Sequence, residues 1–190
     1  GINHLKKRKF SESKRFFIIK ETGAPEFRQP KRGRMFVMKG KKILFINGSP
    51  NKKGNTAKLA EQLLKGRDYE TVSLTDYKVY SYGQNYEDDQ FAEIVGKMKE
   101  ADVIVIGSPL YWHNICGAVR DLLDRFYGPV APGELSGKKF YFLFQGAAPE
   151  KWMLEAGKYT MKRFAAMYGM EYAGMASAGA EAEKLSETLQ

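Results

Sequence analysis

The chain has 190 residues, a single cysteine and a formal net charge of +9. One cysteine excludes an internal disulfide and a metal cluster held only by cysteines of one chain, and it is typical of a reducing compartment, so we expect a cytoplasmic location. No run of residues approaches the roughly 20 apolar positions of a membrane span, so we expect no membrane partner.

The positive charge is concentrated at the start of the chain. Residues 1–42 contain 14 Lys and Arg but only 3 Asp and Glu, a balance of +11, whereas the remaining 148 residues carry −2. Residues 1–40 also lack sustained periodicity and contain Gly and Pro breaks, which predicts a basic N-terminal extension before a domain at 41–190. A basic arm can bind nucleic acid, but a solvated extension is the more common case and the one that we favour.

The first strand and the first helix of this domain are joined by a loop of small and polar residues. The strand is predicted at Lys42–Asn47, around a continuous apolar run typical of buried parallel strands. The helix is predicted at Asn55–Lys65, where apolar residues recur at helical spacing. The loop Gly48–Thr56 therefore leads from a buried strand into the start of a helix.

Such a loop suits a phosphate group. The first N–H groups of a helix are unpaired and its N-terminus is the positive end of the dipole. The hydroxyls of Ser49 and Thr56 and the amide of Asn55 can add hydrogen bonds. A simple turn-and-cap role explains the same composition as well, and the loop is neither a Walker loop nor a dinucleotide fingerprint.

A second strand is predicted at Tyr69–Leu74, followed by a polar, tyrosine-rich stretch at Asp76–Tyr86. Asp88 or Asp89 can cap the helix that comes next. The expected apolar face of that helix is Phe91, Ile94, Val95 and Met98.

Val103–Ile106 predicts another strongly buried strand, and it ends in a loop, Gly107–Asn114, that contains several aromatic residues. The helix after this loop has the clearest apolar stripe in the chain. That stripe consists of Ile115, Ala118, Val119, Leu122, Leu123 and Phe126.

The last third of the chain repeats the alternation. A strand at Phe140–Phe144 ends in the loop Gln145–Pro149, and a final strand is predicted at Tyr172–Ser177. The tail from Gly179 has room for about two or three helical turns. The helix between these two strands, predicted at Glu150–Met167, carries Trp152, Ala156, Tyr159, Phe164 and Met167.

Strands that alternate with helices predict an α/β fold, with a doubly wound parallel sheet between two helical layers. Ligands of such sheets bind beyond the carboxyl ends of the strands. The loops Ser49–Thr56, Ser108–Asn114 and Gln145–Ala148 all follow predicted strands, so they can build one pocket at that edge. A ligand with a phosphate at one end and a flat ring at the other fits their composition.

Three motifs occur together and in order along the chain. They are Gly48-Ser49-Pro50 with Gly54-Asn55-Thr56, Glu100-Ala101-Asp102 with Gly107-Ser108-Pro109-Leu110-Tyr111-Trp112, and Gly117-Ala118-Val119 with Leu123-Asp124-Arg125. In these motifs the sequence resembles the NADPH-dependent FMN reductase family of flavodoxin-like proteins. The likeness covers about residues 41–177 and implies a five-stranded sheet of order 2-1-3-4-5 with FMN as the cofactor.

The resemblance also implies which residues hold FMN. It places the phosphate on Ser49, Asn51, Gly54, Asn55 and Thr56. The isoalloxazine ring is expected against Pro109, Leu110, Tyr111 and Trp112, with Asn114 nearby and Gln145 and Gly146 on the far side. Plain packing of Tyr111 and Trp112 on the following helix is the alternative for the two aromatic residues.

The implied reaction is hydride transfer from NAD(P)H through flavin N5 to a quinone, a free flavin or a similar small acceptor. The flavin carries this chemistry, so no catalytic side chain is expected. Flavin pockets of the family are commonly completed by a neighbouring chain, which implies a homodimer. Two alternatives stay open: an electron carrier like flavodoxin, and a module that binds nucleic acid or a partner through the basic arm.

No metal site is expected. Some members of the family carry a cysteine cluster for an iron–sulfur centre after the second strand, but the corresponding stretch here, Tyr77–Glu87, contains no cysteine. Cys116 is expected to be a small apolar filler rather than a reactive thiol. Asp121, Asp124 and Arg125 lie on one predicted helix and can pair locally.

Overall fold

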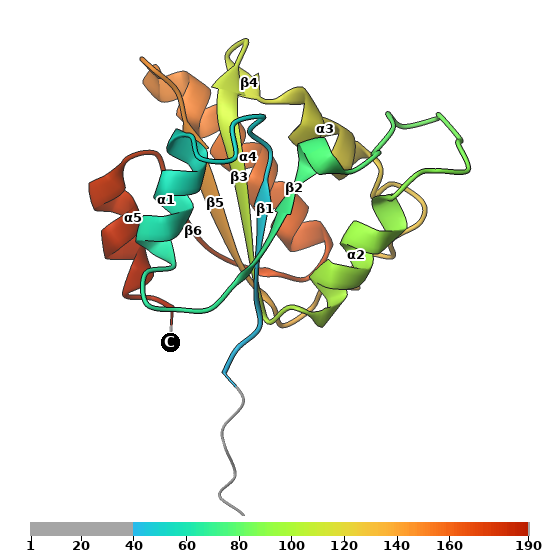
Figure 1. Cartoon of the computed structure of the whole chain (residues 1–190), viewed down its shortest axis with the longest axis horizontal. Helices are drawn as coiled ribbons and strands as arrows, with labels where there is room; N and C mark the ends of the chain where they lie inside the picture. Colours follow the sequence, from blue (N-terminus) through green and yellow to red (C-terminus); the bar gives the residue numbers. More distant parts are fainter. Residues whose placement is uncertain (1–39, 190) are drawn as a thin grey trace, which may run out of the picture. The chain divides into compact units, whose positions relative to one another are not determined.

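Five parallel strands form the central sheet of the computed structural model, which describes residues 40–189 (Figure 1). The predicted extension at residues 1–40 lies outside the described residues, apart from Gly40. The strand order is β2-β1-β3-β5-β6, and a two-residue strand, β4, pairs antiparallel with β3. Numbered along the chain without β4, the parallel strands have the predicted order 2-1-3-4-5. The strands are β1 (Ile43–Asn47), β2 (Glu70–Ser73), β3 (Val103–Tyr111), β4 (Asn114–Ile115), β5 (Lys139–Gln145) and β6 (Glu171–Ala176).

Helices cover both faces of this sheet, as the alternating pattern predicts (Figure 1). One face packs against α1 (Asn55–Leu63) and α5 (Gly179–Ser186). The opposite face packs against α2 (Phe91–Glu100), α3 (Gly117–Asp124) and α4 (Lys151–Met167), and a short 3₁₀ turn, η1 (Leu74–Asp76), follows β2.

None of the described helices is long and apolar enough to cross a membrane.

The core consists of two layers because successive side chains of a strand point to opposite faces. In β1, Leu44 and Ile46 belong to the layer under α2, α3 and α4, whereas Ile43 and Phe45 belong to the layer under α1 and α5. Both neighbours of β1 are parallel to it, so the strand is buried on both faces and reads as a continuous apolar run.

The chain after Ile106 differs from the prediction. Instead of leaving the sheet at Gly107, β3 continues to Tyr111 and pairs with β5 as far as Pro109. Pairing of β1 with β3 ends at Gly107, so β3 has an open edge beyond that point and tolerates a proline. Trp112 and His113 then form a tight turn, with φ of 47° and 66°, that leads into β4.

The face of α4 that packs on the sheet contains only some of the large apolar residues of this helix. Trp152, Tyr159 and Met167 are exposed, and the buried residues of the helix include Met153, Gly157, Met161, Phe164 and Ala165. Gly157 packs against the sheet without a side chain, because a Cβ at that position would overlap the ring of Phe144 in β5. The helix therefore turns its smallest residue toward the sheet and leaves large side chains outside.

Candidate functional site

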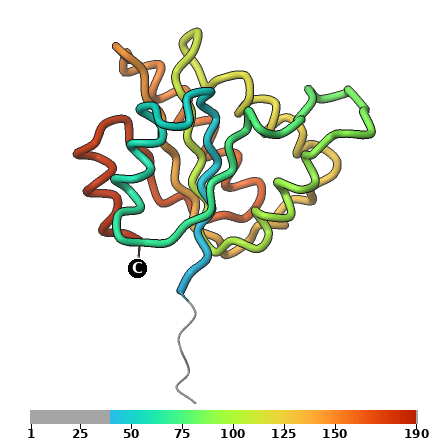
Figure 2. Tube along the Cα trace, in the orientation of Figure 1, coloured from blue at the N-terminus to red at the C-terminus, as the bar shows by residue number. Residues whose placement is uncertain are grey.

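Three loops meet at the carboxyl edge of the sheet, as the sequence predicts. They follow β1, β3 and β5, and in Figures 1 and 2 they lie together at the top of the sheet. Between them lies a hollow of about 330 Å³. Its walls are Ser49, Asn51, Gly54, Asn55, Pro109, Leu110, Tyr111, Gln145, Gly146 and Ala147.

Two larger hollows, each of about 410 Å³, lie at the amino end of the strands. Both are lined by Lys41 and Ile43, directly after the residues that the structure leaves undescribed. We place the site at the carboxyl edge instead, because ligands of doubly wound sheets bind there and only that edge combines a helix N-terminus with the predicted loops.

The loop after β1 is held by its own side chains. The N–H of Ser49 donates to Asn47 Oδ1 at 3.0 Å, and the N–H of Asn51 donates to Ser49 Oγ at 3.2 Å. The N–H of Lys53 donates to Asn51 Oδ1 at 3.1 Å. Ser49 and Asn51 therefore act as acceptors within the loop, which leaves the Ser49 hydroxyl proton and the Asn51 amide protons free to donate to a ligand.

The loop ends at a helix N-terminus that suits an anion. Gly54 is the N-cap residue of α1 and supplies no side-chain cap, so the N–H groups of Asn55, Thr56 and Ala57 have no partner within the helix. The first turn of α1 contains no acidic residue. A Cβ on Gly54 would meet the Asn51 side chain at 3.1 Å, so glycine keeps the approach to these donors open. The residues present therefore fit a phosphate group.

The side chain of Thr56 lies inside the protein. Its side chain is fully buried, does not line the hollow, and accepts a hydrogen bond from Gln145 Nε2 at 3.1 Å. This contact ties the loop after β1 to the loop after β5. The Thr56 side chain thus connects two walls of the hollow. Its backbone N–H is one of the uncapped donors at the start of α1.

The aromatic end of the hollow comes from β3. Pro109, Leu110 and Tyr111 line it, and a Cβ on Gly146 would lie 3.1 Å from Leu110 Cβ, so glycine permits this close approach. Trp112 does not line the hollow and is 95% exposed, which rules out its packing on α3. Asn114 lies in β4, where its Oδ1 accepts the N–H of Ile115 at 2.8 Å.

Comparison with known proteins decides the family. The family described as NADPH-dependent FMN reductase matches residues 41–183, nearly the whole described domain. The chain belongs to this family. FMN is the cofactor of the NADPH-dependent FMN reductases and NAD(P)H their reductant.

Individual relatives share shorter stretches. An iron–sulfur flavoprotein of Archaeoglobus fulgidus is 38% identical over 96 residues, which cover 44% of this chain and 48% of that protein. An iron–sulfur flavoprotein of Methanocaldococcus jannaschii is 34% identical over 98 residues, covering 44% of this chain and 51% of that protein. This chain thus spans about half the length of the curated relatives it matches.

A solved structure supports the fold. The Trp repressor binding protein from Bacillus subtilis superimposes with a TM-score of 0.61 at 20% identity, covering 78% of this chain and all of that chain. At this identity the likeness concerns the fold alone, which is the flavodoxin-like α/β fold of the FMN reductase family.

Two buried residues, Ser108 and Cys116, hold the loops of this FMN reductase domain in position. The sequence alone did not reveal their contacts. Ser108 is fully buried, and its Oγ accepts the N–H of Cys116 at 2.9 Å. Cys116 Sγ donates to the Gly48 carbonyl at 3.3 Å, and the N–H of Gly48 donates to the Gly107 carbonyl at 2.8 Å. The only sequence signal for these contacts was that Gly48, Gly107 and Ser108 fall inside family motifs, and Cys116 lies next to one.

These contacts predict that Cys116 is unreactive in the folded protein. The residue is 3% exposed, and its sulfur is engaged by the Gly48 carbonyl, so a bulky aromatic disulfide reagent cannot reach it. Native protein should release no thiolate dye over minutes, whereas protein in concentrated denaturant should release one equivalent. Rapid stoichiometric reaction of the native protein would contradict this placement.

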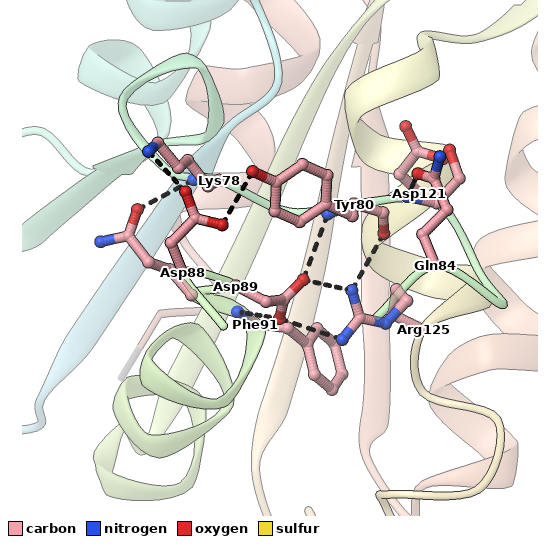
Figure 3. A network of polar contacts seen from close by, with 10 residues as sticks. Lys78, Tyr80, Gln84, Asp88, Asp89, Phe91, Asp121 and Arg125 are labelled. Carbon is pink, nitrogen blue, oxygen red and sulfur yellow. Dashed lines mark hydrogen bonds and ion pairs between the residues drawn. The ribbon is translucent and has the colours of Figure 1, made fainter. Parts of the chain in front are cut away.

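The segment between β2 and α2 is held by a network of polar contacts (Figure 3). Arg125 binds the Asp89 carboxylate through two hydrogen bonds, of 2.5 and 3.0 Å, and also donates to the Tyr80 carbonyl at 3.0 Å. Asp88 accepts bonds from Lys78 Nζ at 2.6 Å and from the Tyr80 hydroxyl at 2.9 Å. This segment includes the cysteine-free stretch Tyr77–Glu87, and it is anchored by ion pairs.

Arg125 does not use the local pairing that the sequence allows on its own helix. Its partner is Asp89, whereas Asp121 accepts a hydrogen bond from Ser81 Oγ at 2.8 Å and Asp124 lies 3.9 Å from Arg120. The Arg125 guanidinium holds the pKa of Asp89 below its ordinary value, against the opposing effect of partial burial. No cluster of His, Cys, Asp and Glu that could hold a metal ion occurs among residues 40–189.

Proposed function

We propose that this chain is an NAD(P)H-dependent oxidoreductase that carries FMN in the hollow at the carboxyl edge of the sheet. Its acceptor would be a quinone, a free flavin or a similar small molecule, and its location cytoplasmic. One observation carries the proposal: two loops that contain family motifs and the loop after β5 line one hollow, with uncapped helix N–H groups at one end and Pro109–Tyr111 at the other.

The chain's own residues would bind and orient the cofactor. The N–H groups of Asn55 and Thr56 and the hydroxyl of Ser49 would hold the phosphate. The ring would lie beside Pro109, Leu110 and Tyr111, with the loop after β5 on its other side. Trp112 and Asn114 do not line the hollow. We propose that they lie at its rim, beside the ring.

Bound FMN supplies the redox chemistry, because it accepts a hydride from NAD(P)H and passes the electrons to the acceptor. The protein contributes position and electrostatics. Backbone N–H groups at the hollow favour negative charge on a ligand, and the walls from β3 and β5 limit which face is open to NAD(P)H. No acidic or basic side chain is required for this step.

Two relatives are named iron–sulfur flavoproteins, but we propose no iron–sulfur cluster for this chain. A cubane cluster needs four cysteine ligands, and these 190 residues contain one, which is buried against Gly48. We therefore propose a flavin-only reaction for this chain.

The test is spectroscopic. The purified full-length chain, incubated with FMN and desalted, should retain a yellow chromophore and lose its absorption within minutes of NADPH or NADH addition without oxygen. Free FMN at the same concentration is the control. A protein that emerges colourless would overturn the proposal. Protein-bound FMN that neither nicotinamide reduces would overturn the reductase assignment and leave an electron carrier.

A further inference from the structure

The side chain of Thr56 is fixed by two neighbours inside the protein. Thr56 is fully buried in the first turn of α1. Gly107 in β3 leaves room for its methyl group, because a Cβ on Gly107 would lie 2.6 Å from Thr56 Cγ2. The hydroxyl meets Gln145, whose Nε2 donates to Thr56 Oγ1 at 3.1 Å. The methyl and the hydroxyl thus have separate partners, which favours a single rotamer of this β-branched side chain.

Gln145, the last residue of β5, lies between the two ends of the hollow at the carboxyl edge. Tyr141 and Leu143 of the same strand pack in the layer under α1 and α5, so Gln145 points to that side as well. There its amide reaches Thr56, beside the uncapped N–H groups of α1. Its backbone lies opposite Pro109 of β3, where the aromatic end of the hollow begins.

Half of the Gln145 amide has no protein partner. Thr56 accepts one N–H of Nε2, and no donor among residues 40–189 bonds to Oε1. Gln145 lines the hollow and is only partly buried, so a ligand there can bond to Oε1 and to the second N–H of the amide. A hydroxyl group suits both of these atoms, because it donates and accepts hydrogen bonds.

We propose that Thr56 is a positioning residue, which orients the amide of Gln145 toward the hydroxyl groups of the chain that links the phosphate and the ring of the ligand. The inference rests on the proposed function, because FMN contains such a chain, its ribityl group. With the phosphate at the start of α1 and the ring beside Pro109, the ribityl group passes Gln145, which lies between them. The Thr56 side chain acts only through Gln145, because it is buried and does not line the hollow.

The test compares two ligands that have the same ends. One is FMN, and the other is an FMN analogue with a pentyl chain in place of the ribityl group, which keeps the phosphate and the ring but has no hydroxyls between them. The full-length wild type should bind FMN about thirtyfold more tightly than the analogue in equilibrium titrations of flavin fluorescence. Thr56→Val keeps the size of the side chain but removes its hydroxyl, and it should lower this preference about tenfold. Gln145→Met should lower the preference as much, and the double variant no further, because both changes remove the same oriented amide.

Two further variants serve as controls. Thr56→Ser retains the hydroxyl and should keep the preference for FMN within about threefold of the wild type. Thr188→Val removes a comparable side-chain hydrogen bond, which joins Thr188 Oγ1 to the Tyr141 hydroxyl at 2.9 Å. Thr188 lies near Lys139 at the start of β5, whereas the hollow lies at the other end of that strand, so this variant should leave the preference unchanged. The preference is a ratio measured within one variant, so a general loss of stability cancels.

Three outcomes would overturn the positioning role while leaving the proposed function intact. Equal binding of FMN and the pentyl analogue by the wild type would mean that the protein binds no hydroxyl of the linking chain. An unchanged preference in Thr56→Val would mean that Thr56 does not orient Gln145. Equal losses in Thr56→Ser and Thr56→Val would assign the effect to packing rather than to the hydroxyl. A wild type that binds neither ligand would overturn the proposed function itself, and this inference with it.

Discussion

Replacing Gly48 with alanine is expected to lower the free energy of unfolding by about 1–3 kcal/mol and to weaken FMN binding by about tenfold or more. The new Cβ would overlap the buried Val119 Cγ2 and would lie 3.0 Å from both Cys116 Sγ and the Gly107 carbonyl oxygen. The loop after β1 must then move away from α3, which displaces Ser49 and the start of α1. Denaturant unfolding measures the first effect, and quenching of flavin fluorescence measures the second.

Gly96 provides the matched control for this substitution. It lies within α2, where a new Cβ would meet no atom within 4 Å. Gly96→Ala should therefore stabilise the protein by about 0.5–1 kcal/mol through helix propensity and leave FMN affinity unchanged. If Gly48→Ala behaves like Gly96→Ala, the close packing of the loop on α3 does not position the loop.

Replacing Arg125 with methionine is expected to cost about 2–3 kcal/mol of stability at pH 7. Arg125 and Asp89 are only 16% and 15% exposed at their side chains, and the variant leaves the carboxylate of Asp89 without its bidentate partner. Methionine keeps most of the packing over Phe91, whose ring centre lies 4.9 Å from the guanidinium carbon. Denaturant unfolding monitored by circular dichroism gives the difference.

Arg120→Met is the control, because Arg120 lies on α3, the helix that ends just before Arg125, and its contact with Asp124 is exposed and 3.9 Å long. Its cost should be below about 0.5 kcal/mol. Equal losses in the two variants would mean that the Arg125–Asp89 pair contributes no more than an ordinary surface charge.

The same pair gives a pH dependence with a defined sign. The hydrogen bonds from Arg125 are the largest cause that lowers the pKa of Asp89 from its ordinary 3.8 in the folded state. The stabilisation is therefore fully present above the unfolded-state pKa and is lost as pH falls below it toward the folded-state pKa. The gap in unfolding free energy between the wild type and Arg125→Met should narrow from pH 7 to pH 3, and a gap that widens would contradict the assignment.

The strands and helices could be predicted from local sequence patterns, because contacts between distant segments did not change them. Val103–Ile106 and Phe140–Phe144 are apolar at every position, and in the structure both belong to central strands with parallel neighbours on each side. The apolar face expected for the second helix, Phe91 to Met98, is the buried face of α2. Burial on both faces of a parallel sheet and helical amphipathicity are the two signals that sequence carries most directly.

Contacts between segments far apart in the chain could not be predicted from the sequence. The loop before α2 brings Asp89 within reach of Arg125, 36 positions away. The close fit of Gly157 against Phe144 favours one face of α4 toward the sheet. The side chain of Thr56, one of the residues expected at the phosphate, accepts a hydrogen bond from Gln145.

By itself the sequence determined the order of strands and helices, the edge of the sheet at which the three loops gather, and the family. These properties depend on apolar periodicity and on short motifs, each contained within a few neighbouring residues. Only the tertiary structure decided which side chains line the hollow, which ones hold its walls together, and which large residues remain on the surface of α4. Those outcomes depend on distances between segments that are far apart in the chain. The local pattern allows more than one face of a helix to be buried, and a single glycine or a single long-range hydrogen bond decides which one is.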